Sequence, residues 1–271
     1  MNSHLNHHLP EPERRRLGDA PAVFLGDKRK QTCRDNFSIV MPVYNEAPVI
    51  EKVITDFHAI VIKNEPGSRL IVMEDGSDDG TKDILNELNR KIPFTLITTK
   101  GRKGYTRAFR DALKIAGTDL VFFTDSDGQH NPYDVFKMLA ELGEFDIVSG
   151  CKCPRRDPFH RRFMSKIYNT FFFLLFGLKV KDINSGFKLI RKKVVDDILP
   201  EVQDMRHCVM SEFILKSFLR GYRIKEVPVD HFPRPQGSTN IFKPKELPFI
   251  IAGITRSLLR IKLRYGKHPK T

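Results

Sequence analysis

Long apolar segments and cysteines are both scarce in this sequence, and their scarcity excludes several classes of protein. No run of apolar residues approaches the roughly 18 that a membrane-spanning helix requires. No apolar segment of the secretory type stands near the N-terminus, so we expect no signal peptide. Four cysteines among 271 residues do not make the disulfide framework of a small secreted protein. The sequence therefore predicts a cytoplasmic protein, associated with a membrane only peripherally, at its cytoplasmic face.

Zinc ligands and acidic residues are scarce as well. Cys151 and Cys153 have no second cysteine pair at the spacing of a zinc site, so we expect both as reduced thiols. Asp and Glu number 33 against 46 Lys and Arg, which gives a net charge of +13. This charge favours an anionic partner, such as a phosphorylated substrate or an anionic membrane surface. We expect no nucleic acid partner, because the basic residues follow no recognised nucleic-acid-binding module.

Three parts are expected along the chain. Residues 1–36 are basic and lack periodic apolar positions, which predicts a disordered arm. Residues 37–242 alternate apolar runs with amphipathic segments, as a folded α/β domain does. Residues 243–271 form an amphipathic, basic C-terminal tail.

Short apolar runs in the middle part predict strands, and the segments between them have helical spacing. The strands are expected at residues 37–43, 69–73, 94–98, 119–124, 145–149 and 224–229. Strands that alternate with helices over short loops indicate a mostly parallel sheet flanked by helices. The carboxyl ends of such strands meet at one edge, which is where ligands bind.

Polar loops follow the first four predicted strands. In strand order they contain Tyr44 to Glu46, Asp75, Lys103 with Gly104, and Asp125 to Asp127. Carboxylates suit ribose and base contacts, and a lysine suits a phosphate. Taken separately, each loop is better explained as an ordinary turn or helix cap. Their convergence on one edge favours a nucleotide-diphosphate site.

Asp125 and Asp127 directly follow a buried run, where carboxylates are costly unless a positive group compensates them. A divalent cation held by both, with Gln129 as a further oxygen ligand, meets this need. Oxygen ligands suit Mg²⁺ or Mn²⁺. The alternative is a solvated turn, since Asp and Gly are common turn residues.

An ordered set of motifs between residues 37 and 242 resembles the family-2 glycosyltransferases. In the first half these are Val43–Glu46, Glu74–Thr81, the Lys103–Gly104 loop and Asp125–Asp127. The second half is similar to polyprenyl-phosphate hexosyltransferases of the dolichol-phosphate mannose synthase type, through Asp182–Phe187, Glu226–Val229 and Arg234–Thr239. The resemblance implies the GT-A fold and transfer with inversion at the anomeric carbon.

The resemblance also implies roles for individual residues. The nucleotide-sugar would be held by Pro42, Tyr44, Glu46, Asp75, Lys103, Asp125 and Ser126, the metal by Asp125, Asp127 and Gln129, and the catalytic residues would be Asp127 and Arg234. Two departures stand out. Thr239-Asn240 replaces a frequent Ser-Lys of the loop that closes over the site, and Glu74 replaces a more common Asp.

The acceptor side is expected in residues 153–180, where arginines precede an aromatic-rich apolar run. This composition suits a helix that lies in a membrane interface. A buried packing helix with a solvated basic flank is the alternative. In the resembled family such arginines bind the phosphate of the lipid acceptor, which implies that role for Arg156, Arg162 and Ser238.

These features predict a hexosyltransferase that uses a nucleotide-sugar of the GDP-mannose or UDP-glucose type and a polyprenyl (dolichyl or undecaprenyl) phosphate. A phosphate nucleophile is already ionised at neutral pH, whereas a hydroxyl acceptor needs a general base. No residue stands out as that base. The alternatives are a transferase with a soluble or protein-bound hydroxyl acceptor, and a nucleotide-sugar-binding module without catalysis.

Overall fold

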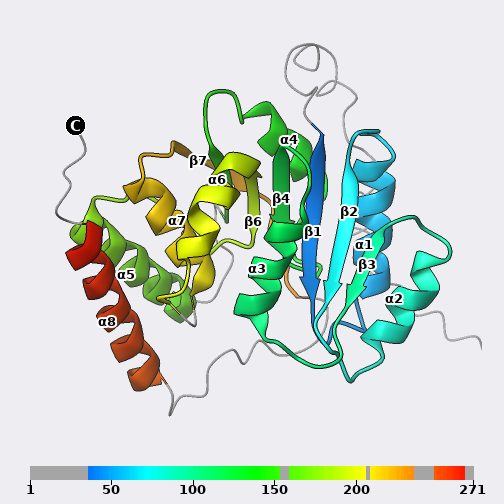
Figure 1. Ribbon diagram of the computed structural model, residues 1–271, viewed down its shortest axis with the longest axis horizontal. Coiled ribbons are helices and arrows are strands. Elements are labelled where there is room, and N and C mark those ends of the chain that lie inside the picture. Colours follow the sequence, from blue (N-terminus) through cyan, green and yellow to red (C-terminus); the bar gives the residue numbers. More distant parts are fainter. Residues whose placement is uncertain (1–35, 153–158, 206–207, 235–246, 266–271) are drawn as a thin grey trace, which may run out of the picture. The chain divides into compact units, whose positions relative to one another are not determined.

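The computed structural model describes residues 36–152, 159–205, 208–234 and 247–265 (Figure 1). These residues form a seven-stranded sheet in the order β3-β2-β1-β4-β6-β5-β7. The strands are β1 (Phe37–Val43), β2 (Arg69–Glu74), β3 (Thr95–Thr98), β4 (Leu120–Thr124), β5 (Ile147–Lys152), β6 (Phe187–Arg191) and β7 (Ile224–Val229). The predicted arm, residues 1–36, lies almost wholly outside the described residues.

The sheet is mostly parallel, as predicted. β1 to β4 pair in parallel, and so do β5 and β7. β6 runs antiparallel to both β4 and β5, between which it lies. This strand was not predicted from the sequence, because the buried Lys188 interrupts its short apolar run. The parallel pairing of strands therefore stops at β4, the strand that leads to Asp125.

Helices cover both faces of the sheet (Figure 1). They are α1 (Ile50–Phe57), which continues as a π-helical turn (His58–Ile62), α2 (Thr81–Asn89), α3 (Tyr105–Ile115), α4 (Asp134–Ala140), α5 (Phe159–Phe176), α6 (Lys192–Ile198), α7 (Val209–Leu219) and α8 (Leu247–Tyr265). Residues of β1 alternate between two apolar cores: Ile39 and Met41 face α1 and α2, whereas Val40 faces α3, α6 and α7. Burial on both faces explains the continuous apolar runs.

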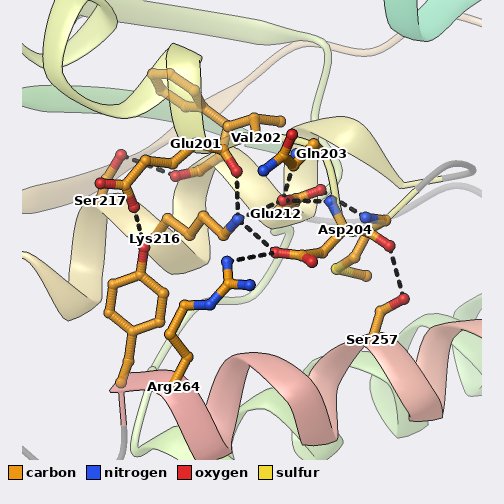
Figure 2. Close-up of polar contacts among 12 residues, drawn as sticks. Glu201, Val202, Gln203, Asp204, Glu212, Lys216, Ser217, Ser257 and Arg264 are labelled. Carbon is orange, nitrogen blue, oxygen red and sulfur yellow. Dashed lines mark hydrogen bonds and ion pairs between the residues drawn. The ribbon is translucent and has the colours of Figure 1, made fainter.

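A buried ionic network joins α7 to the segment before it and to α8 (Figure 2). The side chain of Lys216 is fully buried, and its Nζ donates to Asp204 Oδ2 at 2.7 Å, Glu212 Oε1 at 2.6 Å and the carbonyl of Glu201 at 2.5 Å. Glu212 also accepts the backbone N–H groups of residues 203–205. From α8, Ser257 donates to the carbonyl of Asp204 at 2.7 Å.

Helices α5 and α8 expose many large apolar side chains although both contribute to one core, through Phe172 and Leu258. The exposed ones are Phe163, Met164, Ile167, Phe171, Phe173 and Leu174 on α5, and Phe249, Ile251, Leu259 and Leu263 on α8. We call this set the apolar surface of α5 and α8. Among the described residues, no helix combines the length and the apolar character needed to cross a membrane.

Asp134, the first residue of α4, carries a charge that opposes folding. Burial raises the pKa of its carboxyl to about 6, although the N–H of Asp230 donates to it at 2.7 Å. A raised pKa means that the folded chain binds more protons than the unfolded one, so stability falls as the pH rises from 3.8 to about 6.

Asp134→Asn keeps an oxygen for the N–H of Asp230 and removes the charge. We expect the melting temperature to rise by about 2–4 °C at pH 8. The difference from the wild type should shrink as the pH falls to roughly 4.5, where the native carboxyl is protonated. Thermal unfolding over this pH range checks it, and a difference that does not depend on pH would contradict it.

Candidate active site

The loops after β2 and β3 are fastened together by Asp75. This residue is buried, and its two carboxylate oxygens accept the backbone N–H groups of Lys103 and Gly104, each at 2.8 Å. Next to it, Gly76 has a φ of +74°, and a Cβ there would lie 2.6 Å from the backbone nitrogen of Arg102. Only glycine permits both the conformation and the close approach. Asp75 therefore fixes the backbone of the loop that contains Lys103.

The loop after β1 is anchored to the same region. The N–H of Asn45 donates to Ser77 Oγ at 3.0 Å, and the N–H of Glu46 donates to Thr81 Oγ1 at 2.9 Å. The guanidinium of Arg102 lies over the ring of Tyr44, 4.1 Å from its centroid. The first three loops therefore form one connected edge.

Two other predicted residues lie in this region. Pro42 is buried within β1, and Lys103 Nζ lies 2.8 Å from Asp111 at the surface.

Asp125 and Asp127 directly follow β4 and repel each other. Burial and the neighbouring carboxylate of Asp127 raise the pKa of Asp125 to about 7, whereas Lys152 and Lys188 act in the opposite direction. The hydroxyl of Tyr105, at the start of α3, donates to Asp125 Oδ1 at 3.3 Å. Ser126, between the two acids, is buried. A cation at this place would relieve the repulsion.

Gln129 brings the segment after β7 to the same edge. Its amide nitrogen donates to the carbonyl of Phe232 at 2.9 Å, and the N–H of Phe232 donates back to the carbonyl of Gln129 at 2.8 Å. His130 forms an isolated antiparallel bridge with His231. Arg234 lies two residues after Phe232, so this pairing brings its guanidinium to the same edge.

Arg234 forms an ion pair with Glu46 that the sequence did not predict. Its Nη2 lies 2.6 Å from Glu46 Oε1 and 2.7 Å from Oε2, although 188 residues separate the two in the chain. Burial raises the pKa of Glu46 in spite of the lowering by Arg234. The sequence predicted a nucleoside contact for Glu46 and a phosphate contact for Arg234. The structure shows that these two side chains contact each other.

The donor set fits a divalent cation of the Mg²⁺ or Mn²⁺ type. Among the described residues, no group of three or more His, Cys, Asp or Glu side chains is placed to hold a metal ion. A cation on the predicted ligands Asp125, Asp127 and the amide oxygen of Gln129 would need water or phosphate oxygens to complete its shell. Mg²⁺ commonly binds through one or two carboxylates and substrate phosphates.

The predicted acceptor residues are only partly described. Arg162 is exposed on α5, whereas Arg156 and Ser238 lie outside the described residues. Tyr105 and Lys188, which lie beside Asp125, were not predicted from the sequence. Lys188 is fully buried, donates to Ser149 Oγ at 2.6 Å, and follows Phe187 at the end of a motif that carried the resemblance. The sequence signal that could have identified Lys188 is a lysine within a short apolar run.

A seven-stranded, mostly parallel sheet that is flanked by helices and carries acidic side chains at its carboxyl edge is the GT-A fold of nucleotide-sugar transferases. The glycosyl transferase family 2 model matches residues 38–199, and the chain belongs to that family.

Three known proteins illustrate the similarity. The polyprenol monophosphomannose synthase of Mycolicibacterium smegmatis is 26% identical over 212 residues, which cover 73% of this chain and 78% of that protein. A mannosyltransferase from Pyrobaculum calidifontis, solved with GDP-Man and Mn²⁺, has a TM-score of 0.64 at 20% identity over 88% of this chain and 67% of that one. Glucosyl-3-phosphoglycerate synthase from Mycobacterium tuberculosis, solved with Mn²⁺, UDP and phosphoglyceric acid, has a TM-score of 0.59 at 18% identity over 83% and 79%.

Proposed function

We propose that this glycosyltransferase moves a hexose, with inversion, from a nucleotide-sugar of the GDP-mannose type to a polyprenyl phosphate. One observation carries the proposal: Asp125, Asp127, Arg234 and Glu46 converge on the edge that Asp75 builds with the Lys103 loop. The relative from Mycolicibacterium smegmatis is named for a polyprenol acceptor and mannose, which favours this donor and acceptor over UDP-glucose and a soluble acceptor.

A divalent cation on Asp125 and Asp127 would supply positive charge at the diphosphate leaving group. Two structural relatives were solved with Mn²⁺ and a nucleotide or nucleotide-sugar, which supports this assignment. The chain itself contributes Arg234, whose guanidinium stabilises charge that develops on the departing diphosphate. Glu46 holds that guanidinium at the edge. The acceptor phosphate attacks as an anion and requires no general base.

Arg234→Ala is expected to lower kcat/KM for hexose transfer by about 10²-fold, because one preformed donor to the leaving group is lost. Steady-state kinetics with donor and lipid acceptor check it. Arg69→Ala is a matched control, since Arg69 is exposed at the opposite end of β2. An Arg234→Ala variant with wild-type kinetics would remove Arg234 from the catalytic residues.

The apolar surface of α5 and α8 is the proposed contact with the membrane that contains the acceptor. Exposed apolar side chains beside basic residues such as Arg162 suit an anionic lipid interface. Leu174→Glu and Phe249→Glu place charges at two of its most exposed positions, 71% and 81% accessible. We expect each to reduce co-sedimentation with vesicles that contain anionic lipid several-fold.

Tyr133→Glu is the control for this experiment, because Tyr133 is an exposed aromatic residue next to α4. It should co-sediment like the wild type, and the melting temperatures of all three variants should stay near the wild-type value. If Leu174→Glu and Phe249→Glu bind vesicles as well as Tyr133→Glu does, this surface is not the membrane contact.

The donor and the dependence on acceptor are tested by release of nucleoside diphosphate. GDP-mannose and UDP-glucose are each incubated with Mn²⁺ or EDTA, with and without polyprenyl phosphate. We expect release from GDP-mannose that requires both Mn²⁺ and the lipid phosphate. Release that 3-phosphoglycerate supports equally well would favour a soluble acceptor. If the protein bound the donor but released no nucleoside diphosphate under any condition, it would be a nucleotide-sugar-binding module without catalysis.

A further inference from the structure

Two motifs that carried the resemblance, Asp182–Phe187 and Glu226–Val229, have no role in the site described so far. The structure brings them together behind Asp125. Residues 181–187, which we call the backing loop, end at the first residue of β6, and β6 pairs with β4 through the register Thr124 to Phe187. The N–H of Asp125 donates to the carbonyl of Gly186 at 3.0 Å. The loop therefore reaches the first acid of the proposed metal site directly.

The side chain of Asp125 leaves no space for any side chain at position 186. A Cβ on Gly186 would lie 1.8 Å from Asp125 Oδ2, 2.3 Å from Cγ and 2.7 Å from Oδ1. The φ of Gly186 is outside the left-handed region that favours glycine, so an alanine would adopt this backbone without strain. The contact with the Asp125 carboxylate is thus the feature that requires glycine here.

The backing loop is itself held from two sides. The carboxylate of Glu226, on β7, accepts the N–H of Lys181 at 2.8 Å and that of Asp182 at 2.9 Å. From α5, Asn169 donates its amide N–H to the carbonyl of Lys181 at 2.5 Å and accepts the N–H of Ile183 at 3.4 Å. These bonds fix the start of the loop, residues 181–183.

The residue after Gly186 supports the rest of the metal segment. The ring of Phe187 stacks on His130, with centroids 4.5 Å apart and planes inclined by 14°. His130 follows Gln129 and bridges to His231. One short loop therefore contacts the proposed metal segment at both ends, at Asp125 and at His130.

We propose that Gly186 and the backing loop are positioning elements that fix the Asp125 carboxylate where it binds the divalent cation. This inference rests on the proposed function, because it assigns the loop to the same metal site. The loop contacts no substrate in this account. It acts through Asp125, and Glu226 and Asn169 act through the loop.

A double-mutant cycle tests the contact without any substrate. Gly186→Ala, Asp125→Ala and the double variant are compared with the wild type by thermal unfolding of the full chain in EDTA. We expect Gly186→Ala to lower the melting temperature by several degrees in the wild-type background. The same substitution should lower the melting temperature much less in the Asp125→Ala background, where the three clashing atoms are gone. An equal loss in both backgrounds would overturn the proposal.

Calorimetric titration of the same proteins with GDP and with UDP, each in Mn²⁺ or EDTA, tests the positioning role. The wild type should bind GDP more tightly with Mn²⁺. In Gly186→Ala, the increase in GDP affinity caused by Mn²⁺ should be at least tenfold smaller, and the affinity in EDTA should equal that of the wild type. Glu226→Ala should show a smaller loss of the same kind. Gly117→Ala, before the other end of β4 and with nothing within 4 Å of the added Cβ, should match the wild type.

The outcomes separate the inference from the proposed function. A Gly186→Ala variant with the full Mn²⁺ enhancement overturns the positioning role and leaves the transferase proposal intact. A wild type whose binding of GDP and UDP is unaffected by Mn²⁺ overturns the metal site of the proposed function, whatever the stability cycle shows.

Discussion

Asp127→Asn is expected to lower hexose transfer by about 10³-fold, or roughly 4 kcal/mol of transition-state stabilisation. The change keeps the size of the side chain and removes one of the two charges that would hold the cation. It also removes the repulsion on Asp125, so its pKa should fall and the fold should not suffer. Steady-state kinetics at saturating Mn²⁺, together with the melting temperature, measure both effects.

Asp119→Asn is the matched control for this prediction. Asp119 directly precedes β4, at the opposite end from Asp127, and its side chain is exposed. It should keep wild-type activity. If Asp127→Asn were as active as Asp119→Asn, the carboxylate pair would not be the catalytic centre.

Lys216→Met should destabilise the protein by about 3–5 kcal/mol, because it leaves buried acids without their cation. Lys216 is fully buried and Glu212 nearly so, and Asp204 shares the same ammonium (Figure 2). Methionine keeps the apolar part of the lysine side chain but makes none of the three hydrogen bonds that Lys216 Nζ donates. Urea unfolding followed by circular dichroism gives the change in the free energy of unfolding.

Lys52→Met provides the comparison, since the Lys52–Asp56 pair lies on the exposed side of α1. Exposed pairs of this spacing contribute within about 0.5 kcal/mol. A loss below roughly 1 kcal/mol for Lys216→Met would mean that water or a rearranged Arg264, now 3.8 Å from Asp204, compensates the acids.

The sequence allowed the parallel part of the fold to be predicted because its strands carry a local signal. The runs that end at Val43, Glu74 and Thr124 are mainly apolar, as is typical of strands buried on both faces. The rule that ligands bind at the carboxyl edge then brought Asp75 and Asp125 to one place without further information.

Other features depend on contacts that leave no local pattern. β6 contains the buried Lys188 and follows a turn, so neither its direction nor its place between β4 and β5 could be predicted from spacing. The pairing of Glu46 with Arg234 joins residues 188 positions apart. The need for glycine at 186 comes from the carboxylate of Asp125, which only the folded chain brings there.

The central claim is transfer of a hexose to a lipid phosphate, and following the sugar itself tests it most directly. GDP-mannose labelled in the mannose is incubated with the protein, Mn²⁺ and polyprenyl phosphate, and the label is partitioned between water and organic solvent. We predict label in the organic phase that requires the lipid phosphate and Mn²⁺ and is lost in Asp127→Asn. Label that stays in water while 3-phosphoglycerate supports turnover would contradict the lipid acceptor.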